Sequence, residues 1–284
     1  MSVVAIAARL GLHRAGREWR GACPCCGYPA AFVLSGGTGG RPLGWCSSCQ
    51  NRAGIAAALA GADGYQPRPA IDHQLEDKAA ATARKTARAM GLWAGAEPVP
   101  GTPAEIYLRT RRVEHVASSA ALRFRADCPH PSGGRLPALL ARIDNLSGEL
   151  VAIHRTYLRR DGSGKAQVEP QKASLGPMQG GAIRLDPSAP AIIVAEGIES
   201  AVAAGKLCRL PAWSAVSAGN MARAMVLPEV VRSIVISVDR DPAGERAARE
   251  AAWRWKREGR HVRLLKPNRA GADASDVLIE AANV

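Results

Sequence analysis

Two short apolar runs, each ending in acidic residues, constrain the fold of this 284-residue chain more than any other feature. Residues 191–195 are rich in Ile and Val and are too few for a globular helix, so we expect a buried strand that ends at Glu196. Residues 233–238 form a second such run, which ends at Asp239 and Asp241. The pattern predicts two parallel strands of an α/β fold.

The acidic residues at the strand ends are candidate ligands for divalent cations. Ligands of open α/β sheets bind at the carboxyl ends of the strands, so we expect Glu196, Asp239 and Asp241 to converge there. Magnesium prefers oxygen ligands and usually keeps waters or substrate phosphates in its shell. The alternative is that these are solvated loop carboxylates at the N-termini of helices expected over 198–207 and 243–258.

Glu196-Gly197 followed by Asp239-x-Asp241-x-x-Gly244 resembles the Toprim domain, which bacterial-type primases, topoisomerases and some nucleases share. The resemblance implies a Rossmann-like parallel sheet and catalysis with bound Mg²⁺ or Mn²⁺ at Glu196, Asp239 and Asp241. We expect a further parallel strand at 261–266. Asp273 follows in a loop that resembles the acidic loop after the third strand of many Toprim domains, where it would extend the metal shell.

The cysteines cluster near the N-terminus, where five of the seven fall between Cys23 and Cys49. No export signal precedes them, so the clustering favours a metal over disulfides. Two C-x2-C pairs, Cys23 with Cys26 and Cys46 with Cys49, suit a tetrahedral structural Zn²⁺. Cys25 is an alternative to Cys26, although the spacing and the following Gly favour Cys26. Strands expected at 32–34 and 43–45 would complete a zinc ribbon.

The net charge of +13 points to a polyanionic partner, which nucleic acid would satisfy. Lys and Arg outnumber Asp and Glu six to one in residues 1–62, 18 to 13 in 63–190 and 14 to 11 in 191–284. No apolar run reaches the roughly 20 residues that span a bilayer. The first residues do not form a signal peptide either, and we expect a cytoplasmic protein without a membrane partner.

The middle of the chain predicts an α+β subdomain. A long helix is expected over 73–94, and the sequence Thr102-Pro103-Ala104-Glu105 predicts a second helix that starts with a capping box. Strands are expected at 122–125, 138–143 and 151–158. Together these patterns divide the chain into a zinc ribbon, a basic subdomain and a Toprim domain, over residues 1–62, 73–188 and 189–284.

A zinc ribbon ahead of a Toprim domain resembles bacterial-type primases, in which the ribbon engages a single-stranded template. Residues 73–190 resemble the region before the Toprim domain in phage- and plasmid-type primases. The resemblance suggests contacts with template or triphosphate from Arg155, Arg159, Lys165 and Lys172, and with the single strand from Arg20, Arg41 and Trp45. Taken singly, each cation is also typical of a solvated surface.

The resemblance implies a metal-dependent nucleotidyltransferase that makes short primers on single-stranded DNA from nucleoside triphosphates, beside a separate replicative helicase. One alternative is a Toprim-type metal-dependent nuclease, against which the ribbon and the basic segment argue. Another is a non-catalytic zinc/Toprim DNA-binding recombination mediator, against which the intact acidic set argues.

Overall fold

The computed structural model describes residues 2–47, 51–60, 73–269, 271, 274 and 276. The chain divides into two compact units, Met1–Glu76 and Asp77–Val284. Among the described helices, none is long and apolar enough to cross a membrane.

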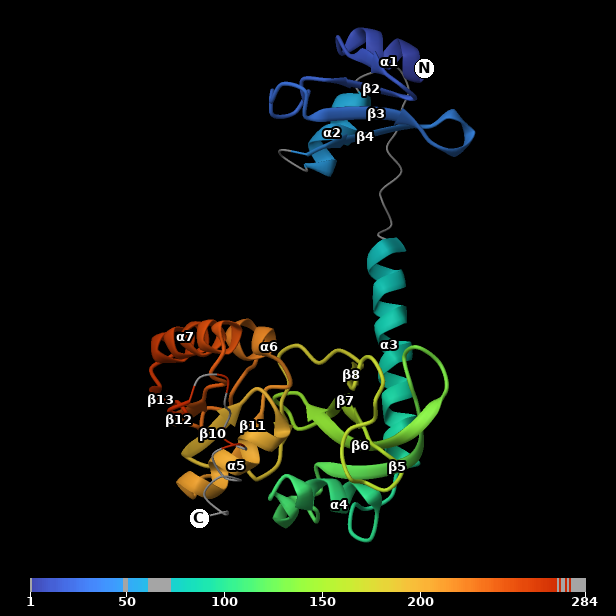
Figure 1. Cartoon of the computed structure of the whole chain (residues 1–284). Helices are drawn as coiled ribbons and strands as arrows, with labels where there is room; N and C mark the ends of the chain where they lie inside the picture. The colour runs from blue at the N-terminus through green and yellow to red at the C-terminus, as the bar shows by residue number, and fades with distance from the viewer. Residues whose placement is uncertain are drawn as a thin grey trace. The chain divides into compact units, whose positions relative to one another are not determined.

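The first unit is built on a four-stranded antiparallel sheet with the order β1-β2-β3-β4 (Figure 1). Side chains alternate between the two faces of β3, so Phe32 and Leu34 point to the same side of the sheet. There they pack in a small core with Ile6 and Ile55 from the helices. The elements are α1 (Val3–Arg9), β1 (His13–Ala15), β2 (Glu18–Gly21), β3 (Phe32–Gly36), the 3-10 turn η1 (Thr38–Gly40), β4 (Pro42–Cys46) and α2 (Arg52–Ala60).

The second unit begins with an antiparallel sheet of order β5-β6-β7-β8. The boundary between the units falls within α3 (His73–Ala94), most of which belongs to the second unit. The elements that follow are α4 (Pro103–Thr110), the 3-10 turn η2 (Glu114–Val116), β5 (Leu122–Pro129), β6 (Arg135–Asp144), β7 (Leu150–Tyr157) and β8 (Lys172–Leu175). Successive side chains of β6 point to opposite faces of the sheet and so contribute to two hydrophobic cores. Leu140 packs with Ala89 of α3, and Leu139 packs with Leu108 of α4. The sheet is therefore covered by α3 on one face and α4 on the other.

The predicted capping box at the start of α4 does not form. Pro103 occupies the first turn as expected, but Thr102 makes no side-chain cap and instead donates its hydroxyl to the Val99 carbonyl at 2.6 Å. Glu105 accepts from the Gly101 N–H at 2.7 Å, one residue before the expected donor. The Thr102 hydroxyl stabilises the preceding turn, so the two halves of a capping box do not form.

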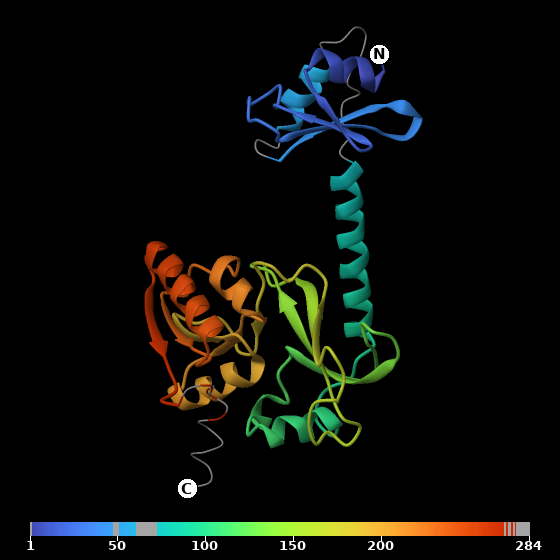
Figure 2. The ribbon, with the colours of Figure 1, turned by 45° about the horizontal axis from the view of Figure 1, so that its top comes forward.

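The C-terminal part, drawn in gold to red in Figure 2, holds a five-stranded sheet of order β13-β12-β10-β11-β9. All neighbouring strands in it are parallel except β11 and β9. Helix α5 covers one face, and α6 and α7 cover the other. The elements are β9 (Ile183–Arg184), β10 (Ala191–Ala195), α5 (Ile198–Cys208), β11 (Ala212–Ser214), α6 (Ala218–Arg223), β12 (Ser233–Ser237), α7 (Pro242–Arg257) and β13 (His261–Leu265).

Burial on both faces explains why β10 reads as a continuous apolar run. Ile192 and Val194 pack under α6 and α7, whereas Ile193 and Ala195 pack under α5. The core under α5 also contains residues of α4, β5 and β6, so the antiparallel subdomain and the parallel sheet share one hydrophobic core. This shared core fixes the antiparallel subdomain against the strand ends that carry the acidic residues.

Candidate functional site

The ends of β10 and β12 bring two of the predicted carboxylates to one pocket. The strands pair in parallel with Ala191 opposite Ser233 and Val194 opposite Ile236, so they end at the same edge of the sheet. Glu196 and Asp239 both line a pocket of about 180 Å³ at this edge.

Asp241 has a second role as the N-cap of α7. Its Oδ1 accepts from the Gly244 N–H at 2.7 Å, which satisfies one of the open donors of the first turn. A Cβ at Gly244 would lie 2.6 Å from the Asp239 carbonyl oxygen, so the turn is too close for any larger residue. The glycine of the D-x-D-x-x-G pattern therefore allows the loop after β12 to fold back on the helix.

The charges at the strand ends are compatible with a divalent cation. Burial raises the pKa of Glu196, and the nearby Asp241 adds to this, while the Ala218 N–H and Lys172 oppose it. A bound cation would relieve this burial of negative charge. Among the described residues, Glu196, Asp239 and Asp241 are not gathered closely enough to form a group of potential metal ligands by themselves. Asp273 lies outside the described residues.

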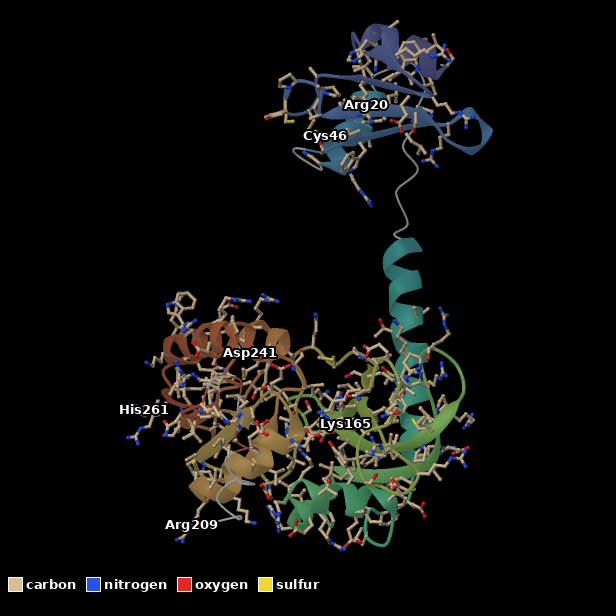
Figure 3. The ribbon with its side chains drawn as sticks, viewed as in Figure 1. Arg20, Cys46, Lys165, Arg209, Asp241 and His261 are labelled. Carbon is tan, nitrogen blue, oxygen red and sulfur yellow. The ribbon has the colours of Figure 1, made fainter. Side chains whose placement is uncertain are left out.

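The same pocket is also lined by cations, which come from the antiparallel subdomain. Lys165 follows β7, Lys172 begins β8 and Arg111 follows α4. Burial lowers the pKa of Lys165, and the nearby Lys172 ammonium lowers it further. The pocket is therefore lined both by acidic residues from the strand ends and by cations. Figure 3 labels Lys165 of the pocket and Asp241, which follows β12 but does not line the pocket.

A glycine holds the Lys165 loop in place. Gly162 has a φ of +72°, and a Cβ there would lie 2.3 Å from the Pro103 carbonyl oxygen of α4. The loop is closed by a bridge between Leu158 and Lys165 and by the Arg159 N–H, which donates to Gly164 at 2.9 Å. Close packing on α4 thus directs the loop toward the pocket.

Two of the predicted phosphate contacts do not line this pocket. Arg155 is only 6% exposed, and its guanidinium donates to the Pro129 and Ala173 carbonyls at 3.0 and 3.3 Å. These bonds tie β7 to the end of β5 and to β8, so the Arg155 guanidinium has a structural role. The predicted phosphate contact of Arg155 stays a prediction. Arg159 is exposed on the loop outside the pocket.

Sequence reasoning missed Glu199, a buried residue of the same pocket. Its Oε1 accepts from the Tyr107 hydroxyl at 2.5 Å and its Oε2 accepts from Lys172 Nζ at 3.0 Å. Tyr107 and Arg111, both from the region of α4, were missed as well. The available signal was position, because Glu199 lies one helical turn after Glu196 at the start of α5.

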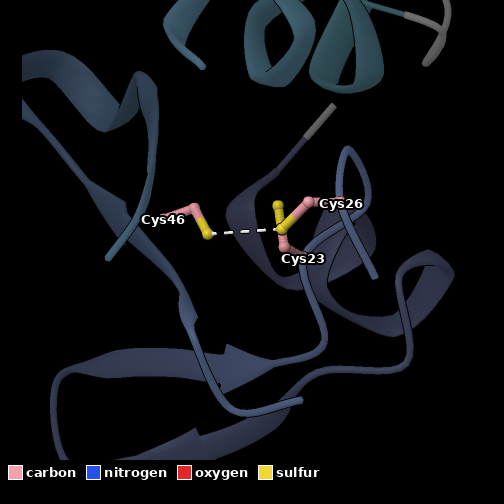
Figure 4. A group of neighbouring side chains, drawn as sticks. All are labelled: Cys23, Cys26 and Cys46. Atoms are coloured by element: carbon pink, nitrogen blue, oxygen red, sulfur yellow. Dashed lines mark hydrogen bonds between the residues drawn. The ribbon is translucent and has the colours of Figure 1, made fainter. Parts of the chain in front are cut away.

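The first unit contains a sulfur cluster in which Cys23, Cys26 and Cys46 bring all three Sγ atoms within 4.8 Å of one another (Figure 4). Cys26 and Cys46 Sγ lie 3.9 Å apart, near the about 3.8 Å that tetrahedral Zn–S bonds require. Cys25 instead accepts from the Asn51 side chain at 3.4 Å. The cluster suits Zn²⁺ and uses Cys26, while Cys49 lies outside the described residues.

The opposite side of the ribbon brings Arg20 and Trp45 onto one face. Arg20 pairs with Val33, and Val33 pairs with Trp45, so the three form a row across β2, β3 and β4. Trp45 is 49% exposed, and Arg20 forms an exposed ion pair with Glu18 at 3.2 Å. Arg41 is exposed just before β4.

Comparison with known proteins identifies two segments of the chain. Residues 191–283 match the family model of the Toprim domain, and residues 83–185 match a domain of unknown function (DUF7146). No curated protein matches the chain.

Solved structures that align with this chain include primases. The primase fragment of the bacteriophage T7 primase-helicase protein aligns at 14% identity and a TM-score of 0.44, over 93% of this chain and 95% of that one. The zinc-binding and RNA polymerase domains of Aquifex aeolicus primase align at 14% identity and a TM-score of 0.44, over 99% of this chain and 80% of that one.

The family match agrees with the observed topology. The matched residues 191–283 begin at β10 and include the parallel strands and the acidic strand ends. The predicted fold class, a C-terminal parallel sheet preceded by an α+β subdomain and an N-terminal β ribbon, is confirmed. The C-terminal part of this chain is a Toprim domain.

Proposed function

We propose that the protein is a metal-dependent nucleotidyltransferase of the primase type, which joins nucleotides on a single-stranded DNA template. The observation that carries this proposal is the mixed charge of one pocket, which is lined by Glu196 and Asp239 from the strand ends and also by three cations, Lys165, Lys172 and Arg111. Cations alone would suit a phosphate, and carboxylates alone would suit a metal. A metal-bound triphosphate needs both.

The acidic side would hold the metal. Glu196, Asp239 and Asp241 would supply the charged oxygen donors that Mg²⁺ or Mn²⁺ prefers, and Asp273 is a further candidate ligand. When bound, the metal would activate the attacking 3′-hydroxyl and neutralise charge on the triphosphate and the leaving pyrophosphate.

The basic side would hold the triphosphate. Lys165 and Lys172 supply ammonium donors, and Arg111 contributes a guanidinium whose Nε is buried without a hydrogen-bond partner in the described part of the chain. An unpaired buried donor is unfavourable, so an anionic ligand would stabilise it. Arg159 would contact template phosphates outside the pocket, and Arg155 has its donors engaged in the fold.

The N-terminal ribbon would engage the template. The row of Arg20, Val33 and Trp45 offers a cation and an aromatic face on one side of the sheet, which suits a phosphate and an unstacked base. Arg41 would add a further phosphate contact. A structural Zn²⁺ on the cysteines would fix this sheet, and a separate replicative helicase would supply the single strand.

One incubation separates this activity from its rivals. The protein is mixed with single-stranded DNA, labelled nucleoside triphosphates and Mg²⁺, and products are resolved by size. Labelled products longer than one nucleotide support the proposal. Shortened DNA without extension would identify a nuclease, and intact DNA bound without either product would identify a binding protein.

A further inference from the structure

Glu199 is a buried acid between the acidic and basic sides of the pocket. It is 6% exposed, and its two oxygens accept from Tyr107 at 2.5 Å and from Lys172 at 3.0 Å. Burial alone would raise the pKa of Glu199, but the Lys172 ammonium and the Tyr107 hydroxyl more than offset it and hold the pKa well below its usual range. Glu199 is therefore a carboxylate, and its charge is paired.

These contacts distinguish Glu199 from the metal-ligand candidates. Each of its oxygens already accepts a strong hydrogen bond from another part of the fold, Tyr107 on α4 and Lys172 on β8. Glu196, one turn earlier, sits at the end of β10. Helix α5, which follows the end of β10, thus contacts Lys172 of the pocket through the Glu199 side chain.

We infer that Glu199 is a positioning residue, which fixes the Lys172 ammonium at the wall of the pocket so that it meets the phosphates of an incoming nucleoside triphosphate. This inference rests on the proposed function. A free lysine side chain has four rotatable bonds, and one buried ion pair removes most of that freedom before the ligand arrives. The ammonium keeps further N–H donors beyond the one that Glu199 accepts.

Charge balance supports the same role. Lys165 and Arg111 line the pocket beside Lys172, so these three cations would repel one another without a nearby anion. Glu199 supplies that anion from the protein side, behind the ammonium. A ligand of high negative charge density, such as a triphosphate, then meets cations that are already assembled.

The test compares Glu199→Gln, Lys172→Gln and the double variant with the wild type. Equilibrium binding of a fluorescent ATP analogue with Mg²⁺ and no template is followed by anisotropy, and primer synthesis gives KM and kcat. We expect each single variant to weaken analogue binding and to raise KM about tenfold, as the loss of one charge-assisted hydrogen bond implies, with kcat changed less than about twofold. The double variant should bind no more weakly than Lys172→Gln.

The control is Glu250→Gln, which removes an exposed acid 4.0 Å from Arg223 and should change nothing. Wild-type binding by Glu199→Gln, or losses that multiply in the double variant, would overturn the inference. If Glu199→Gln does not fold, the double variant is compared with Lys172→Gln alone, because the double variant removes both charges of the pair. Weaker binding of the analogue by the double variant would then overturn the inference. Wild type that binds the analogue but makes no primer would reject the proposed function and leave the inference standing.

Discussion

At the scale of single residues, the pocket separates groups that must stay charged from one that must stay neutral. His154 lines the pocket, and its Nδ1 lies 3.1 Å from Ser174 Oγ. Burial, helped by the charges of Lys172, Arg155 and Lys165, lowers the pKa of His154 to about 4, although the charge of Glu199 opposes the shift. The folded protein therefore keeps this ring neutral where an unfolded chain would protonate it.

This difference predicts an acid sensitivity. The histidine of an unfolded chain titrates near pH 6.5. Between about pH 6.5 and 4 the unfolded chain therefore binds a proton that the folded chain does not bind, so the free energy of unfolding falls as the pH falls. We expect His154→Asn to flatten the decline of the urea midpoint across this window. His261→Asn, at an exposed position of β13, is the control and should follow the wild type. An unchanged slope in His154→Asn would contradict the assignment.

Asp241 combines a structural and a chemical role, which two substitutions separate. Asn keeps an N-cap oxygen for the Gly244 N–H, whereas Ala loses it and should destabilise the protein by about 1 kcal/mol. Both lose a negative metal ligand, so we expect both to lose primer synthesis. Urea unfolding and product yield are measured together. Equal stability of Asp241→Ala and Asp241→Asn would show that the cap contributes nothing.

At the scale of elements, segments with a clear apolar pattern could be predicted, whereas several of the shortest strands could not. The helix over 73–94 and the strand over 191–195 match α3 and β10, because their length and apolar pattern determine their type. Strands β1, β2 and β11 have three or four residues each and were missed. Such short strands are specified by their partners in the sheet, which a linear pattern does not contain.

The site shows the same division. Glu196 and Asp239 were predicted because strand ends are visible in the sequence, and the structure places both in one pocket. Glu199 and Tyr107 meet only through the packing of α4 on α5, 92 residues apart in the chain. A glutamate in a helix reads as a surface charge, so its burial could not be predicted.

The cysteine cluster gives a prediction for the ribbon as an element. We expect Cys26→Ser to lose Zn²⁺, since Cys26 lies with Cys23 and Cys46, and Cys25→Ser to keep it, since Cys25 contacts Asn51. The two variants are matched, being neighbours with the same change. Metal content per chain is measured after gel filtration. Loss of zinc in Cys25→Ser with retention in Cys26→Ser would reverse the assignment.

At the scale of the whole molecule, the net charge of +13 predicts that the affinity for single-stranded DNA depends on the salt concentration. Counterion release makes log affinity fall linearly with log salt, by about 0.7 per phosphate neutralised. In the full chain, Arg20→Gln should lower the slope by about that amount, while Trp45→Ala should weaken binding without changing the slope. Arg257→Gln, on the exposed side of α7, is the control. Wild-type affinity and slope in both ribbon variants would remove the ribbon from the template path.

The most direct test of the account is primer synthesis by Asp239→Asn relative to its binding of template. The substitution removes a negative ligand from the pocket and keeps almost the same shape, so the fold and the template contacts should be retained. We expect primer yield to fall on the order of a hundredfold or more, because charge on the triphosphate goes uncompensated, with template affinity equal to or above wild type. Undiminished synthesis by Asp239→Asn, or a wild type that binds single strands and extends no nucleotide with Mg²⁺ or Mn²⁺, would contradict the account.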